Sequence, residues 1–135
     1  MYSCTRSVIF AIFIVGSWFG NCAYGQELYQ TYTFYKFNGY VEKAEAKDAN
    51  DRSEIYYFLK MQNPIDVYDE DTKSKNINID EVQLVFLSKV KTKYVEILNR
   101  NVVIKGKLFP SISAHHHKKI LLEVNETKDI VIADK

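Results

Sequence analysis

The sequence predicts a mostly β domain with a single helix. Apolar and polar residues alternate through most of the chain after residue 26, and a period of two is typical of strands with one buried face. One stretch breaks this period, because Val90, Tyr94 and Ile97 recur at spacings of four and three and share one face of a helix. The 10 tyrosines and 8 phenylalanines supply core material, whereas 5 glycines and 2 prolines leave no linker. We therefore expect one compact domain.

Three strands are expected before the helix. The first, at residues 29–46, is long and rich in aromatic and β-branched residues, and Gly39 in its middle indicates a bulge or a sharp bend. The second spans residues 54–62 and ends at a proline, with residues 65–68 as its continuation past a kink. The third spans residues 81–87. Polar connections separate these strands at residues 47–51 and 69–78.

A helix of about three turns is expected at residues 89–98, with Ser88 as its N-cap and Val90, Tyr94 and Ile97 packed inward. Two more strands and a short edge segment complete the chain. They are expected at residues 102–109, 119–124 and 130–132. In the fourth strand, one face is expected to carry Val102, Ile104, Gly106 and Leu108, and the other face Val103, Lys105, Lys107 and Phe109.

Three strands, a helix and two strands is the element order of the OB-fold, a five-stranded Greek-key barrel. A long first strand bent at Gly39 fits this fold, because that strand serves both halves of the barrel. An open α+β sheet with the same elements is the alternative. In an OB barrel the loops after strands one and four lie near the usual ligand face, and here these are residues 47–51 and 110–117.

The N-terminal residues 1–25 have the features of a cleaved signal peptide. Arg6 precedes an apolar run at residues 8–19, which is short for a membrane span, and Ala23-Tyr24-Gly25 offers small residues at a cleavage site. An uncleaved anchor is the alternative. Cleavage after Gly25 leaves a single OB-like domain at residues 26–135, exported to the periplasm or secreted, with no membrane contact.

The predicted mature chain lacks thiol chemistry and net charge. Both cysteines, Cys4 and Cys22, leave with the signal peptide, which excludes zinc ribbons and cysteine hydrolases. Without Arg6, 17 of the 18 basic residues remain against 17 acidic residues. A neutral domain lacks the positive field of a general nucleic-acid binder, so no nucleic-acid partner is expected.

All 3 histidines stand together as His115, His116 and His117, and they are the candidate site residues. If the loop is extended there, His115 and His117 point to one side and His116 to the other. A His-x-His pair is a possible ligand set for zinc or copper. The simpler interpretation is that one histidine fixes the loop by packing while the others are solvated, and a third is a pH-sensing loop.

A zinc site needs further ligands, for which the candidates are Asp48, Asp51 and Glu123. Other clusters point to ordinary surface. Ser111 and Ser113 lack a nucleophile-elbow motif. Four acidic residues, at positions 66, 69, 70 and 71, lack the spacing of an EF-hand loop.

The strand at residues 102–109, the histidines, and the strand Ile120-Leu121-Leu122-Glu123-Val124 resemble the C-terminal signature of a bacterial family described as a domain of unknown function. The stretch Asn38-Gly39-Tyr40-Val41 and the later Tyr56-Tyr57-Phe58-Leu59 resemble its opening strands. The resemblance implies a small exported protein and implies no activity.

Two functions remain. The first is an exported non-enzymatic module that binds a small ligand, a metal or a protein at the barrel mouth and the His115–His117 loop. The alternative is a metal-assisted hydrolase with His115 and His117 as ligands.

Overall fold

The computed structural model describes residues 27–133, so the predicted signal peptide lies outside the described residues. In chain order the elements are β1 (Leu28–Gln30), β2 (Phe34–Lys47), β3 (Ser53–Asp69), β4 (Ser74–Phe86), α1 (Tyr94–Ile97), β5 (Asn101–Pro110), β6 (Ile120–Val124), the 3-10 helix η1 (Thr127–Asp129) and β7 (Ile130–Ile132). No helix in this part of the chain is long and apolar enough to cross a membrane.

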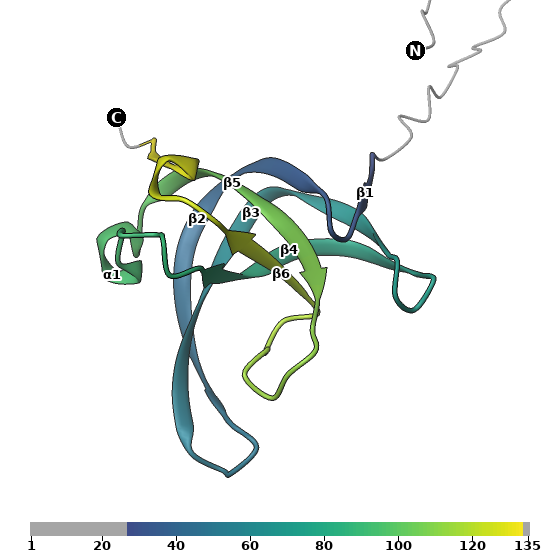
Figure 1. Cartoon of the computed structure of the whole chain (residues 1–135), viewed down its shortest axis with the longest axis horizontal. Helices are drawn as coiled ribbons and strands as arrows, with labels where there is room; N and C mark the ends of the chain where they lie inside the picture. Colours follow the sequence, from purple (N-terminus) through teal and green to yellow (C-terminus); the bar gives the residue numbers. More distant parts are fainter. Residues whose placement is uncertain (1–26, 134–135) are drawn as a thin grey trace, which may run out of the picture.

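Five strands close into a barrel (Figure 1). β2 pairs antiparallel with β3 and β5, β3 pairs antiparallel with β4, and β6 pairs antiparallel with β5 and parallel with β4. This strand order, with α1 between the third and fourth barrel strands, is that of the OB-fold. The predicted barrel is confirmed, and the alternative of an open sheet is wrong. β1 adds to β3 in parallel, and β7 adds to β5 antiparallel.

Gly39 is the residue at which β2 changes its pairing partner. Residues 34–40 of β2 pair with β5 and residues 39–47 pair with β3, so Gly39 is opposite both Val102 and Met61. A Cβ on Gly39 would lie 2.5 Å from the carbonyl oxygen of Lys60, closer than any side chain tolerates. The sharing of one strand by both halves of the barrel therefore requires glycine here.

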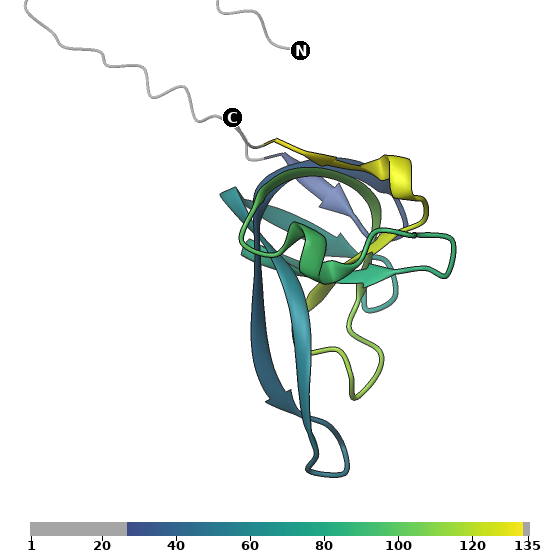
Figure 2. The ribbon, with the colours of Figure 1, turned by 90° about the vertical axis from the view of Figure 1, so that its left-hand side faces the viewer.

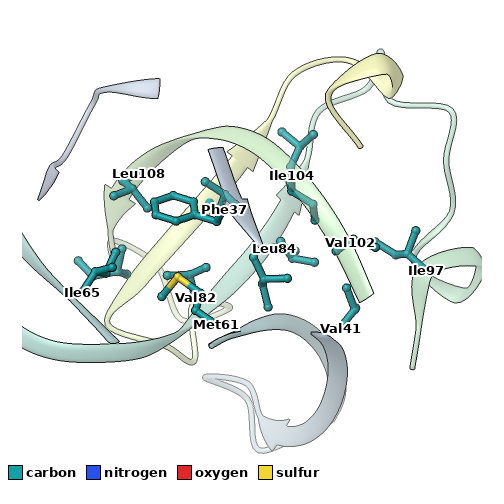
Figure 3. Packing of buried hydrophobic residues seen from close by; sticks show 14 of the residues in the cluster. Phe37, Val41, Met61, Ile65, Val82, Leu84, Ile97, Val102, Ile104 and Leu108 are labelled. Carbon is teal, nitrogen blue, oxygen red and sulfur yellow. The ribbon is translucent and has the colours of Figure 1, made fainter. Parts of the chain in front are cut away.

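The core fills the barrel interior (Figure 3). β5 shows the predicted alternation, because Val102, Ile104, Gly106 and Leu108 are all buried while Lys105 between them is exposed. The buried apolar cluster draws on every barrel strand and on α1. Its members are Phe37, Val41, Leu59, Met61, Ile65, Val67, Val82, Leu84, Ile97, Val102, Ile104, Leu108, Ile120, Leu122 and Val124.

The predicted first strand is wrong at its start, because a turn separates β1 from β2. The Thr31 amide donates to the carbonyl of Tyr68 in β3, whereas the Tyr32 amide donates to the carbonyl of Leu108 in β5. Tyr32 has a φ of 63°. This left-handed conformation breaks the extended backbone, and the chain crosses here from β3 to β5.

The predicted polar loop at residues 69–78 is also wrong. β3 continues through Pro64 to Asp69, and β4 begins at Ser74, so the third barrel strand starts seven residues before its predicted start at residue 81. Acidic side chains build the hairpin: Asp69 accepts hydrogen bonds from the Asp71 amide and the Thr72 hydroxyl. This part of the hairpin is largely solvent-exposed, so its sequence resembles a loop.

The predicted helix at residues 89–98 is too long. α1 covers only Tyr94–Ile97, and Lys93 rather than Ser88 precedes it. Lysines at positions 89, 91 and 93 would have placed positive charge at the N-terminus of the longer helix, which opposes the helix dipole. Instead the Lys91 amide donates to the Thr127 hydroxyl. The predicted inward face is confirmed, since Ile97 is fully buried with Val90 and Tyr94 packed against the core.

Candidate functional site

The β2–β3 hairpin and the loop between β5 and β6 project from the same end of the barrel. Both views show the hairpin extending well beyond the barrel, with the loop beside it (Figures 1 and 2). We call residues 43–57 of the hairpin the arm and residues 111–119 the histidine loop. These are the two loop regions in which an OB barrel is expected to bind its ligand.

Gln83 in β4 anchors the histidine loop. Its side chain is only 6% exposed. Its Nε2 donates to the carbonyl of His115 at 2.9 Å, and its Oε1 accepts from the amides of His117 at 2.6 Å and Lys118 at 3.3 Å. The side-chain amide of Gln83 therefore bonds the backbone of a loop that has no strand partner. Because buried polar groups require partners, these hydrogen bonds also satisfy the buried Gln83 side chain.

Glu54 near the tip of the arm holds two of the histidines. One carboxylate oxygen lies 2.7 Å from Nδ1 of His115, and the other contacts Nε2 of His117. These hydrogen bonds lower the pKa of the Glu54 carboxyl, with the His115 contact as the larger cause. The ring of His117 also lies 4.8 Å from that of Tyr56. Glu54 therefore ties the arm to the loop.

His116 points away from this cluster and supports the loop from the other side. Its ring meets Phe109 edge to face, with centroids 5.6 Å apart, and its Nδ1 accepts a hydrogen bond from the Ile112 amide at 3.0 Å. Burial lowers the pKa of His116, and the neighbouring His115 and His117 lower it further. The neutral imidazole is thus the form that fits this position.

The histidines divide as the sequence suggested, but for a different reason. The loop is a turn rather than an extended segment, because the His116 amide donates to the carbonyl of Ser113. Ser111 and Ser113 are turn residues too, since their hydroxyls bond to the backbone of His116 and His115.

The carboxylate at the histidines is Glu54, which sequence reasoning missed together with Gln83. The acids suggested from sequence have other partners: Asp48 binds Arg52, Asp51 binds Lys47, and Glu123 binds Lys107. Glu54 gave no signal in the sequence because it is the first residue of a predicted strand in which polar and apolar residues alternate, and a polar residue is expected there. Among the residues that the structure describes, no group of three or more histidines, cysteines and acids is arranged to hold a metal.

A cleft opens beside the histidine loop because β3 and β4 diverge. Phe58 and Gln83 are their last paired residues on this side; beyond them β3 follows β2 into the arm, while β4 pairs with β6. The space between has a volume of about 410 Å³. We call it the β3–β4 cleft. Its lining residues are Glu54, Ile55, Tyr56, Tyr57, Gln83, Leu84, Val85, Tyr94, His115 and His116.

Tyr94, the first residue of α1, also lines the cleft. Its ring stacks on Tyr57 at 4.7 Å and on Phe86 at 4.2 Å between centroids. Its hydroxyl accepts from the Phe86 amide at 2.9 Å and donates to the Leu84 carbonyl at 3.4 Å. Burial raises the pKa of this hydroxyl, which keeps it a proton donor.

One comparison with known proteins gives a match. A family model described as Domain of unknown function (DUF4431) matches residues 81–128, from the end of β4 to η1, and this segment includes the histidine loop. No curated protein and no solved structure matches the chain. The chain is therefore similar, over these 48 residues, to a family to which no function is assigned.

Proposed function

We propose that this protein is an exported, non-enzymatic binding module that takes its ligand in the β3–β4 cleft beside the histidine loop. The observation that carries the proposal is the divergence of β3 and β4, which leaves an open, tyrosine-lined space of about 410 Å³ in an otherwise closed barrel. Ligand pockets in proteins commonly fall between about 300 and 1,000 Å³ and combine apolar walls with a few polar groups.

The composition of the lining supports binding rather than catalysis. Tyr56, Tyr57 and Tyr94 offer aromatic surface, and Glu54 and His115 add hydrogen-bonding groups at one end. Glu54 already binds two imidazoles, so it is positioned more as a structural tie than as a general base.

A titration with a small ring compound tests this proposal. The probe is N-acetyltyrosine amide, and the readout is the amide chemical shifts of the ¹⁵N-labelled domain. We expect the shifts to change at Ile55, Tyr57, Leu84 and His115, which line the cleft. Shift changes spread evenly over the barrel, or none at millimolar probe, would reject the cleft as a binding site.

Two exposed isoleucines provide a matched pair of variants. Ile55 lines the cleft and is 58% exposed, whereas Ile77 is 67% exposed in the opposite part of β4. Ile55→Glu places a charge in the cleft and should abolish the shift changes, and Ile77→Glu should leave them intact. Equal effects of the two substitutions would indicate non-specific binding.

The same protein tests the alternative of a metal-assisted hydrolase. Calorimetric titration with Zn²⁺ and with Cu²⁺ should show no stoichiometric binding, because the described residues contain no group of three or more histidines, cysteines and acids arranged to hold a metal. Tight uptake that disappears on replacing both histidines would favour the hydrolase instead.

Export has its own measurement. Intact-mass analysis of the protein from its native host should give a chain that starts at Gln26. A membrane-bound species that retains Met1 would contradict cleavage after Gly25.

A further inference from the structure

The strand β3 presents an open backbone edge to the cleft. The Val41 amide and carbonyl bond to Arg100 and Asn99, on the β5 side of β2. Because successive residues of a strand turn their backbone groups to opposite neighbours, Glu42 faces β3 and its partner Phe58 faces β2. The register is continuous from there, so Tyr56 also faces β2.

The residues between these turn the other way. Ile55 and Tyr57 direct their N–H and C=O groups away from β2, toward the cleft. The pairing of β3 with β4 ends at Phe58 and does not reach them. A strand edge of this kind is a template for another extended chain.

The opposite wall of the cleft shows how such an edge is satisfied from outside. The Leu87 amide bonds to Val124 in β6, so Phe86 and Leu84 turn their backbone groups toward the cleft. The Tyr94 hydroxyl takes both the Phe86 N–H and the Leu84 C=O. The Tyr94 hydroxyl therefore makes the two hydrogen bonds that a residue of a neighbouring parallel strand would make to β4. The edge of β4 is blocked in this way, whereas the edge of β3 at Ile55 and Tyr57 is open to the cleft.

Charge narrows the ligand class. Among the described residues that line the cleft, Glu54 is the one carboxylate, and none is a lysine or arginine. Lys118 lies beside the cleft over the rings of Tyr56 and Phe58, and its ammonium pairs with Glu81. Each oxygen of an ionised carboxylate has two acceptor positions, so Glu54 can accept a further donor while it holds His115 and His117. Lys43 and Glu45 in β2 are opposite Tyr57 and Ile55 in β3. The positive charge of Lys43 and the negative charge of Glu45 offset each other.

We propose that the β3–β4 cleft binds an extended, basic peptide segment, which pairs with the open edge of β3 at Ile55 and Tyr57 and directs a lysine or arginine side chain to Glu54. This inference rests on the proposed function, since it names the ligand class of the same cleft. Backbone pairing supplies affinity in this mode of recognition, and side chains supply selectivity.

Three end-blocked peptides separate backbone pairing from charge. The first alternates lysine and valine over six residues, the second replaces lysine by glutamate, and the third is the lysine peptide with alternate amides N-methylated. Affinity is measured by fluorescence anisotropy at pH 8, above the range in which histidines ordinarily protonate. The lysine peptide should bind at least about tenfold more tightly than each of the other two.

A proline at position 55 tests the edge from the side of the protein. Because the Ile55 amide faces the cleft, Ile55→Pro removes a donor that β2 does not use, and proline is tolerated at such an edge. The variant should keep its amide dispersion and lose at least about tenfold in affinity for the lysine peptide. Ile55→Ala, which keeps the N–H, should lose less than about threefold.

Each outcome decides the proposal. Equal binding of the N-methylated peptide, or unchanged binding by a folded Ile55→Pro variant, would overturn the edge pairing. Equal binding of the glutamate peptide would overturn the role of Glu54. If no peptide binds while N-acetyltyrosine amide still shifts the cleft residues, this inference fails and the proposed function stands. If neither probe binds, both fail.

Discussion

The interior of this barrel and its polar end, where the arm meets the histidine loop, are held together by different forces. In the interior, apolar side chains from every barrel strand and from α1 pack together, and Ile104, Leu122 and Ile97 are fully buried. At the polar end, the arm and the histidine loop are joined by hydrogen bonds of two polar side chains, Gln83 and Glu54. Burial of apolar surface is tolerant of detail, whereas each polar contact depends on one particular partner. Local substitutions should therefore act very differently in the two regions.

The interior should show the largest effect. Leu122→Ala in β6 removes a fully buried side chain that lies between Leu108 and Leu84, and we expect a loss of about 2–5 kcal/mol in unfolding free energy. Denaturant titration measures it. Leu87→Ala, at a position 39% exposed, is the control and should cost much less. A comparable cost for both would mean that the core does not dominate stability.

Tyr94 belongs to both regions, since its ring packs on the core and its hydroxyl caps β4. Tyr94→Ala should cost about 2–4 kcal/mol because it removes the ring between Tyr57 and Phe86. Tyr94→Phe keeps the ring and should cost about 0.5–1.5 kcal/mol for the lost hydrogen bonds. The same titrations measure both, and equal losses would show that the hydroxyl, not the stack, carries the contribution.

Gln83→Ala sharpens the comparison at the polar end. The substitution leaves the His115 carbonyl and the His117 amide without their partner, and we expect a loss of about 1–3 kcal/mol. Hydrogen exchange should rise in residues 111–119 and stay unchanged in β5. Uniformly faster exchange would instead mean that Gln83 supports the whole barrel.

The smallest effect is a pH dependence at His116. Its folded pKa lies below the ordinary value of 6.5, so the unfolded chain takes up a proton first as the pH falls. The contribution of neutral His116 to the unfolding free energy is therefore fully present above about pH 6.5 and decreases as the pH falls below that value. His116→Phe keeps the ring and removes the titration. Denaturant titrations at pH 7.5 and 5.5 should show that the unfolding free energy falls more at the lower pH in the wild type than in His116→Phe. Equal falls in the two proteins would contradict a lowered pKa at His116.

The barrel could be predicted from the sequence because its signals are local. The alternation through Val102, Ile104 and Leu108 and the glycine at position 39 each report on their own strand. The predicted boundaries were wrong where contacts between distant residues decide the local structure. At the start of the predicted helix, the Lys91 amide bonds to the Thr127 hydroxyl instead of forming a helical turn. At the start of the predicted first strand, Thr31 bonds to β3 and Tyr32 bonds to β5.

The candidate site could be predicted only in part. The three histidines are conspicuous in the sequence. Their partners are not, because Gln83 is 32 positions before His115 and Glu54 is 61 positions before it. The cleft arises where two strands stop pairing, and no residue pattern marks that point.

The open edge of β3 is the central feature of this account, and amide hydrogen exchange tests it most directly. In the free protein the amides of Glu54 and Tyr56, which face β2, should exchange slowly, while those of Ile55 and Tyr57, which face the cleft, should exchange fast. This alternation along four consecutive residues is the expected result. Equal protection of all four amides would mean that another strand covers this edge and that no cleft is available for a ligand.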